Sequence, residues 1–188
     1  LSPNEHQIER VVRGLAALGV GRIDEAMGLF DAAYEGMRQW RTLTTWHWRM
    51  ALEWGMADAC LASDRTDEAE HHARLFHDSA FAIRERTWRA LASESCARIA
   101  LRKGDLPAAA EHLRRGWAEM EPGDLKLAAW RLHAVEVELH DRSGNHTAAD
   151  RHRSDWRDAL QALASTLPAD HIGRRTLAGA RPIFGPVS

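Results

Sequence analysis

Three residues of one segment have a spacing that could bind a metal ion. His133, Glu136 and His140 stand at positions i, i+3 and i+7, so one face of a helix would carry all three. Imidazole nitrogens and carboxylates are zinc ligands, and a catalytic zinc needs only three of them from the protein. The sequence has no HExxH spacing, no second coordinating cluster and no paired Cys and His residues. A metal-dependent helical hydrolase is therefore the weakest of three functions considered, and we expect no cofactor.

The remaining polar residues do not assemble the groups that an active site needs. There is no glycine-rich phosphate loop, and Ser93 and Ser95 lie near Glu94 in a predicted helix rather than at a nucleophile elbow. We therefore predict that the chain is not an enzyme. The other clustered histidines are expected on solvated helix faces, and these are His71, His72, His77, His146 and His152.

Composition limits the class of partner. The 188 residues suit one domain or one repeat array, and 25 Lys and Arg against 27 Asp and Glu give a net charge of -2. This balance provides no bulk attraction for nucleic acid or anionic lipid.

Cys60 and Cys96 are expected as buried, reduced thiols, which fits a cytoplasmic protein. No apolar run is long enough to span a membrane. Because the chain begins at Leu1, we expect a piece of a longer protein.

Four short phrases indicate turns between paired helices. Each has a glycine or aspartate five positions before an alanine, and the phrases are Gly21–Ala26, Asp64–Ala69, Gly104–Ala109 and Gly144–Ala149. The key alanines, Ala26, Ala69, Ala109 and Ala149, are separated by 43, 40 and 40 residues. Glycine, and to a lesser degree aspartate, tolerates the left-handed backbone that ends a helix. The fixed period predicts stacked helical hairpins.

The pattern of apolar residues gives the expected helices. The first helices cover 5–19, 46–62, 86–102 and 125–142, and the second helices cover 24–40, 67–83, 107–120 and 147–165. Breaks are expected at 41–45 and 121–124. Asp24, Asp67 and Thr147 are the expected N-caps, and small residues twelve positions before three of the alanines should let paired helices approach closely. Trp46, Trp48 and Trp54 cannot all share one inward helix face, so at least one should be exposed.

The repeat resembles the tetratricopeptide repeat. In the first unit the resemblance rests on Gly14, Gly21, Ala26, Phe30 and Ala33. In later units it is carried by Ala57, Ala69, Ala73, Ala97, Gly104, Ala109, Leu113, Gly144, Ala149 and Trp156. The period is longer than the usual 34 residues, and Arg153 stands where an apolar residue is expected.

This resemblance implies an all-α, right-handed solenoid of four antiparallel hairpins in one domain, 1–181. Its units are approximately 5–41, 45–84, 86–122 and 125–165, followed by a capping helix over 167–180 and an extended or disordered tail over 182–188.

The resemblance also implies that the first helices line a concave surface. Counting back from the key alanines places the following residues there: Trp54, Asp58, Leu61, Glu94, Arg98, Arg102, Glu138 and Arg142. Such a surface could hold a peptide, with an apolar anchor at Trp54 and charges that fix its register. The alternative is that these charges only solvate an unused face.

We therefore expect a scaffold module that binds a protein, a peptide or an adjoining domain, in a larger cytoplasmic bacterial signalling protein or transcription regulator. The second hypothesis is a sensor that holds a small ligand with Trp54, Glu94 and Arg98. No nucleic-acid or membrane partner is expected. A homodimer is plausible because no polar cap precedes Ile8 and Val12.

Overall fold

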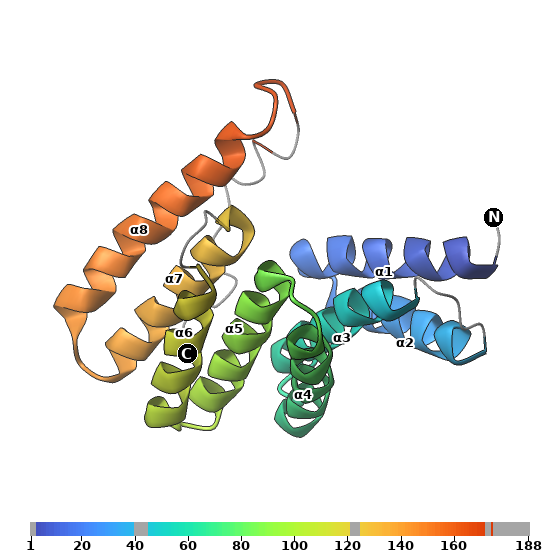
Figure 1. The fold of residues 1–188 in the computed structure, drawn as a ribbon, viewed down its shortest axis with the longest axis horizontal. Coiled ribbons are helices and arrows are strands. Elements are labelled where there is room, and N and C mark those ends of the chain that lie inside the picture. The colour runs from blue at the N-terminus through green and yellow to red at the C-terminus, as the bar shows by residue number, and fades with distance from the viewer. Residues whose placement is uncertain (1–2, 40–44, 121–124, 172–173, 175–188) are drawn as a thin grey trace. The chain divides into compact units, whose positions relative to one another are not determined.

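The computed structural model describes residues 3–39, 45–120, 125–171 and 174. These residues form eight α-helices and no strand (Figure 1). The helices are α1 (Pro3–Gly19), α2 (Ile23–Gln39), α3 (Thr45–Ala62), α4 (Thr66–Ala82), α5 (Arg86–Arg102), α6 (Leu106–Met120), α7 (Lys126–Arg142) and α8 (His146–Ser165). The all-α prediction is confirmed, and every predicted helix end lies within two residues of an observed one. No helix in the described part of the chain has the length and apolar content needed to cross a bilayer.

The turns inside the four hairpins share one geometry. Gly21, Gly104 and Gly144 have φ angles of +78°, +79° and +75°, and Asp64 has +58°. In each turn the next amide donates to the carbonyl five residues earlier, a Schellman pattern. These bonds are Arg22 N to Ala17 O, Arg65 N to Cys60 O, Asp105 N to Ala100 O and Asn145 N to His140 O, all 2.9 Å. The predicted left-handed helix ends are therefore confirmed in all four turns.

The predicted N-caps of the second helices are wrong. Helices α2, α4 and α8 begin before Asp24, Asp67 and Thr147, so these side chains stand inside the first turn. The Schellman turn uses a single left-handed residue, and the residue directly after it becomes the cap. At that position the Asn145 side chain accepts a hydrogen bond from Ala148 N, and Asp105 accepts one from Ala108 N.

The chain divides into two compact units, Leu1–Arg84 and Glu85–Ser188, and each is described by itself. In the first unit α1 packs on α2 and α3 on α4, while α3 also contacts both α1 and α2. Phe30 is fully buried and needs glycines around it. A Cβ on Gly14 would lie 2.4 Å from the Phe30 ring, and one on Gly55 would lie 2.6 Å from it. The prediction that Gly14 permits a close helix approach is confirmed.

The second unit repeats this packing. Helix α5 packs on α6 and α7 on α8, while α7 also contacts α5 and α6. Its core contains Ala97, Ala100, Leu101, Ala109, Leu113, Leu132, Val135 and Leu139. All four key alanines of the chain are fully buried. In both units, therefore, the first helix of the second hairpin packs against both helices of the first.

Some predicted features fall wholly or partly outside the described residues. These are the breaks at 41–45 and 121–124, the capping helix at 167–180 and the tail at 182–188. Within the predicted capping helix, residues 167–171 are described and lie outside any helix, whereas the one other described residue, Arg174, is helical. Trp46 is 55% exposed, which confirms that not all three tryptophans of α3 face inward.

Candidate functional site

The eight predicted groove residues are divided between the two units. Trp54, Asp58 and Leu61 lie on α3 in the first unit, and the other five lie on α5 and α7 in the second. Trp54 is half-buried, whereas Asp58 and Leu61 are buried. The predicted groove residues therefore differ in how far solvent reaches them, and some of them are buried.

Glu94 and Arg98 belong to a buried charge cluster of the second unit. Arg131 Nη2 on α7 donates to Glu94 Oε2 on α5 at 3.1 Å, and Arg98 Nε lies 3.8 Å from Glu94 Oε1. Glu94 is 0% exposed, Arg131 3% and Arg98 8%. Charges this deeply buried have to be paired, because an unpaired charge would lose its hydration without compensation. The cluster thus joins α5 to α7.

Glu138 and Arg142 are predicted groove residues of the second unit that solvent reaches. They form an ion pair one helical turn apart on α7, with side chains 29% and 34% exposed. Arg142 Nη1 also donates to the carbonyl of Leu101 at the end of α5. Arg102, the next residue on α5, is half-buried. Opposite charges are therefore available to a partner at this end of α5 and α7.

The first unit contains a second buried carboxylate that the sequence analysis missed. Glu53 on α3 is 1% exposed and bonds Arg49 Nε at 2.5 Å and His72 Nδ1 of α4 at 2.6 Å. Arg49 in turn donates to the Tyr34 hydroxyl of α2 at 2.7 Å, with its guanidinium over the ring. The network connects three helices. The expectation that His72 is merely solvated is wrong, since its side chain is 12% exposed.

A group of histidines gathers where α7 meets α8. His133 Nδ1 on α7 lies 3.1 Å from His152 Nδ1 on α8, and the Trp117 ring of α6 packs against His133 at 4.6 Å. Two sets of possible metal ligands share His152. One is His133, His152 and Asp155, and the other is Glu136, His140 and His152; within each set the ligand atoms lie within 4.8 Å of one another.

Burial controls the protonation of this group. Desolvation lowers the pKa of His133 from 6.5 to about 4, and it also lowers the pKa of His152. Asp155 opposes the shift at both histidines, because its negative charge favours imidazolium. At neutral pH both rings are therefore uncharged. One Nδ1–H can then donate to the lone pair of the other ring, or both lone pairs can face one cation.

The set His133, Glu136 and His140 proposed from sequence is not one of the sets that the structure brings together. His152, which was expected to be solvated, is half-buried and belongs to both sets. One signal for it was present in the sequence. His72, His112 and His152 each stand three residues after a key alanine, and Glu53, Ser93 and His133 each stand sixteen residues before it. In two hairpins the structure pairs these positions, as His72 with Glu53 and His152 with His133.

The two cysteines, Cys60 and Cys96, are free thiols. Cys60 is buried and Cys96 half-buried, and neither forms a disulfide. Burial raises the pKa of Cys60, so its thiol stays protonated. The expected buried, reduced cysteine is confirmed for Cys60.

Compared with protein-family models, with curated proteins and with solved structures, the chain matches none of them.

Proposed function

We propose that this chain is a non-catalytic module that binds a protein or peptide, or an adjoining domain of its parent protein. In this proposal its four hairpins form a right-handed, tetratricopeptide-like solenoid, part of a larger cytoplasmic bacterial regulator. The first helices of the hairpins face the partner.

The observation that carries the proposal is the packing repeated in each unit. Helix α3 contacts both α1 and α2, and helix α7 contacts both α5 and α6. This is the contact by which one helical hairpin adds to another in a repeat array, whose units bury their apolar faces against their neighbours. The four equal turns and buried key alanines support the same interpretation. Folds of this kind offer extended surfaces to other chains.

The positions of the charged side chains indicate which residues of the second unit would contact a partner. Glu94 and Arg98 are buried, so they stabilise the packing of α5 on α7 and do not contact a partner. Glu138, Arg142 and Arg102 provide the accessible charges. Charges at the rim of an interface mainly set association rate and register. We therefore propose that these three residues orient the bound partner.

Peptide selection with a matched pair of variants tests the proposal. Peptides enriched from a random displayed library on the native chain would be measured by fluorescence polarisation against wild type, Glu138→Lys and Glu111→Lys. Glu138 pairs with Arg142 on the first helix of its hairpin, and Glu111 pairs with Arg115 at the same spacing on a second helix. We expect Glu138→Lys to weaken binding about tenfold, or roughly 1.4 kcal/mol, and Glu111→Lys to leave it unchanged.

Two results would contradict the proposal. One is that no peptide is enriched on the native chain relative to heat-unfolded protein. The other is that the selected peptides bind Glu138→Lys as tightly as wild type, which would place the contact away from the first helices.

A further inference from the structure

We infer that His133, His152 and Asp155 form a binding site for a divalent transition-metal ion of the zinc type. This site lies within the hairpin of α7 and α8 and is separate from the proposed peptide contact. The ligands would be the two Nδ1 atoms and one carboxylate oxygen. Imidazole and carboxylate groups suit zinc and its neighbours, and three protein ligands leave a fourth tetrahedral position for water.

The spacing of the two nitrogens carries the inference. Two nitrogens bound to one zinc at about 2.0–2.1 Å and near the tetrahedral angle stand roughly 3.3 Å apart. His133 Nδ1 and His152 Nδ1 are 3.1 Å apart, and the ring planes are tilted by 42°. The two rings therefore already hold the same kind of nitrogen close to the separation that one ion requires. A small rotation of either ring opens the separation that an ion requires.

The third ligand, Asp155, lies on the same helix as His152. Asp155 follows His152 by three residues on α8, so the two side chains lie on the same helix face. The ligand atoms of His133, His152 and Asp155 lie within 4.8 Å of one another. All three residues belong to one antiparallel helix pair, so the packing of α7 on α8 positions the whole ligand set.

The second ligand set is less suited to an ion. Glu136 Oε1 already accepts the indole N–H of Trp117 at 3.0 Å, and Glu136 Oε2 lies 3.5 Å from His140 Nε2. The rings of His140 and His152 are stacked, 5.4 Å apart with planes 17° from parallel, so their in-plane lone pairs do not converge. We therefore assign Glu136 and His140 to the surroundings of the site rather than to its ligands.

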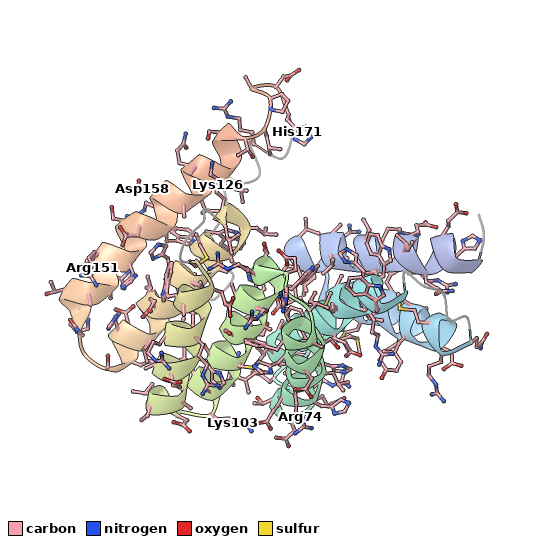
Figure 2. All side chains as sticks on the ribbon, viewed as in Figure 1. Arg74, Lys103, Lys126, Arg151, Asp158 and His171 are labelled. Carbon is pink, nitrogen blue, oxygen red and sulfur yellow. The ribbon has the colours of Figure 1, made fainter. Side chains whose placement is uncertain are left out.

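The local charges agree with this assignment. The guanidinium of Arg151, labelled in Figure 2 on α8, has its Nη2 3.5 Å from His152 Nε2. That nitrogen is on the opposite side of the ring from Nδ1, which faces His133.

The metal-free state has its own hydrogen bond. One Nδ1–H donates to the other Nδ1, so each neutral ring keeps one proton. When the ion binds, the donor ring moves its proton from Nδ1 to Nε2, and both Nδ1 lone pairs then face the metal. The charge of the rings is unchanged, and no proton is released.

Metal titration of the full, untagged chain tests the inference. After treatment with chelator and buffer exchange, Zn²⁺ alone is titrated by calorimetry, and Co²⁺ by its visible absorption. We expect one strong site per chain, a tetrahedral cobalt spectrum and a zinc-dependent rise in melting temperature. His152→Gln, His133→Gln and Asp155→Asn should each weaken binding by at least about tenfold. Circular dichroism in chelator establishes that each variant is folded.

Two matched variants serve as controls. His112→Gln removes the histidine at the same repeat position on α6, and Glu136→Gln removes the carboxylate of the competing set. Both should keep the wild-type zinc affinity and cobalt spectrum. Asp155→Glu, which preserves the carboxylate, should retain more affinity than Asp155→Asn.

The inference is overturned by any of three results. Wild type could bind zinc only weakly and at several sites, as exposed histidines would. A folded His152→Gln variant could bind with wild-type affinity. Alternatively, Glu136→Gln could lose the ion while Asp155→Asn retains it, which would place the ion in the other set.

Discussion

At the scale of single residues, the buried carboxylate of Glu94 makes the strongest prediction about stability. Glu94→Gln would remove the negative charge that compensates Arg131 and Arg98, all three of them buried. Breaking one partner of a buried pair typically lowers the free energy of unfolding by about 3–5 kcal/mol. Urea denaturation would measure the change.

The control for Glu94 is an exposed ion pair. Glu111 contacts Arg114 and Arg115 on the surface of α6, where such pairs contribute little. Glu111→Gln should therefore leave the free energy of unfolding nearly unchanged. Equal losses in the two variants would show that burial of Glu94 is not the source of the effect.

The histidines make a prediction about pH. His133 has a folded-state pKa of about 4 against 6.5 in the unfolded chain, so the unfolded state binds more protons between these values. The contribution of His133 to stability is complete above pH 6.5 and is lost as the pH falls toward 4. In chelating buffer, wild type should lose more stability between pH 7.5 and 5 than His133→Gln does.

The exposed histidine His146 provides the reference for this measurement. Its side chain is 78% exposed, so His146→Gln should keep the wild-type pH dependence of unfolding. If His133→Gln and wild type lose stability in parallel, burial does not depress the pKa of His133.

The functional residues were only partly predictable from sequence. The local i, i+4 pair of Glu138 and Arg142 can be seen from spacing on one helix. The partners of Glu94 and His133 cannot, because Arg131 is 37 residues from Glu94 and His152 is 19 residues from His133. Only the register between helices places these side chains together. The recurring histidine after each later key alanine was the available signal for His152.

At the scale of the helices, glycine determines how closely α1 and α2 approach. Gly14→Ala would place a methyl group 2.4 Å from the Phe30 ring, which is fully buried and also confined by Gly55. Overpacking of this kind costs about 1–3 kcal/mol. We expect a lower melting temperature and a lower free energy of unfolding for this variant.

Gly28 offers the opposite case in the same helix pair. A Cβ at this exposed position of α2 would meet nothing within 4 Å. Gly28→Ala should therefore raise stability by about 0.5–1 kcal/mol, because alanine has the higher helix propensity. Thermal melts of the two variants side by side separate steric conflict from propensity. A stabilised Gly14→Ala variant would contradict the packing of Phe30.

The helices themselves were predictable because their signals are local. A glycine or aspartate with left-handed backbone followed five residues later by a buried alanine fixed all four hairpin turns. The start of α5 had no such marker. There Glu85 accepts hydrogen bonds from the amides of Thr87 and Trp88, a capping role that glutamate seldom suggests in a sequence. The N-caps were misplaced by two residues, because the residue directly after the left-handed one already serves as the cap.

At the scale of the whole molecule, the division into two compact units predicts local rather than global effects of core mutations. Leu52 and Leu132 are both fully buried, one on α3 in the first unit and one on α7 in the second. Leu→Ala at either site should cost about 2–5 kcal/mol. Native-state hydrogen exchange should show the larger loss of protection within the unit that carries the substitution.

Each leucine variant is the control for the other. Equal loss of protection in both units, in both variants, would show that the chain unfolds as one cooperative body.

The shared hydrogen-bond pattern of the four turns makes the hairpins interchangeable at these points. Gly104 is followed by Asp105, and a chain that returned from Gly144 to Asp105 would contain the same Gly–Asp junction again. In-frame duplication of residues 105–144 would thus lengthen the protein by one copy of α6 and α7 without creating a new turn sequence. Duplication of such a segment is therefore a way in which evolution or protein engineering could lengthen this protein.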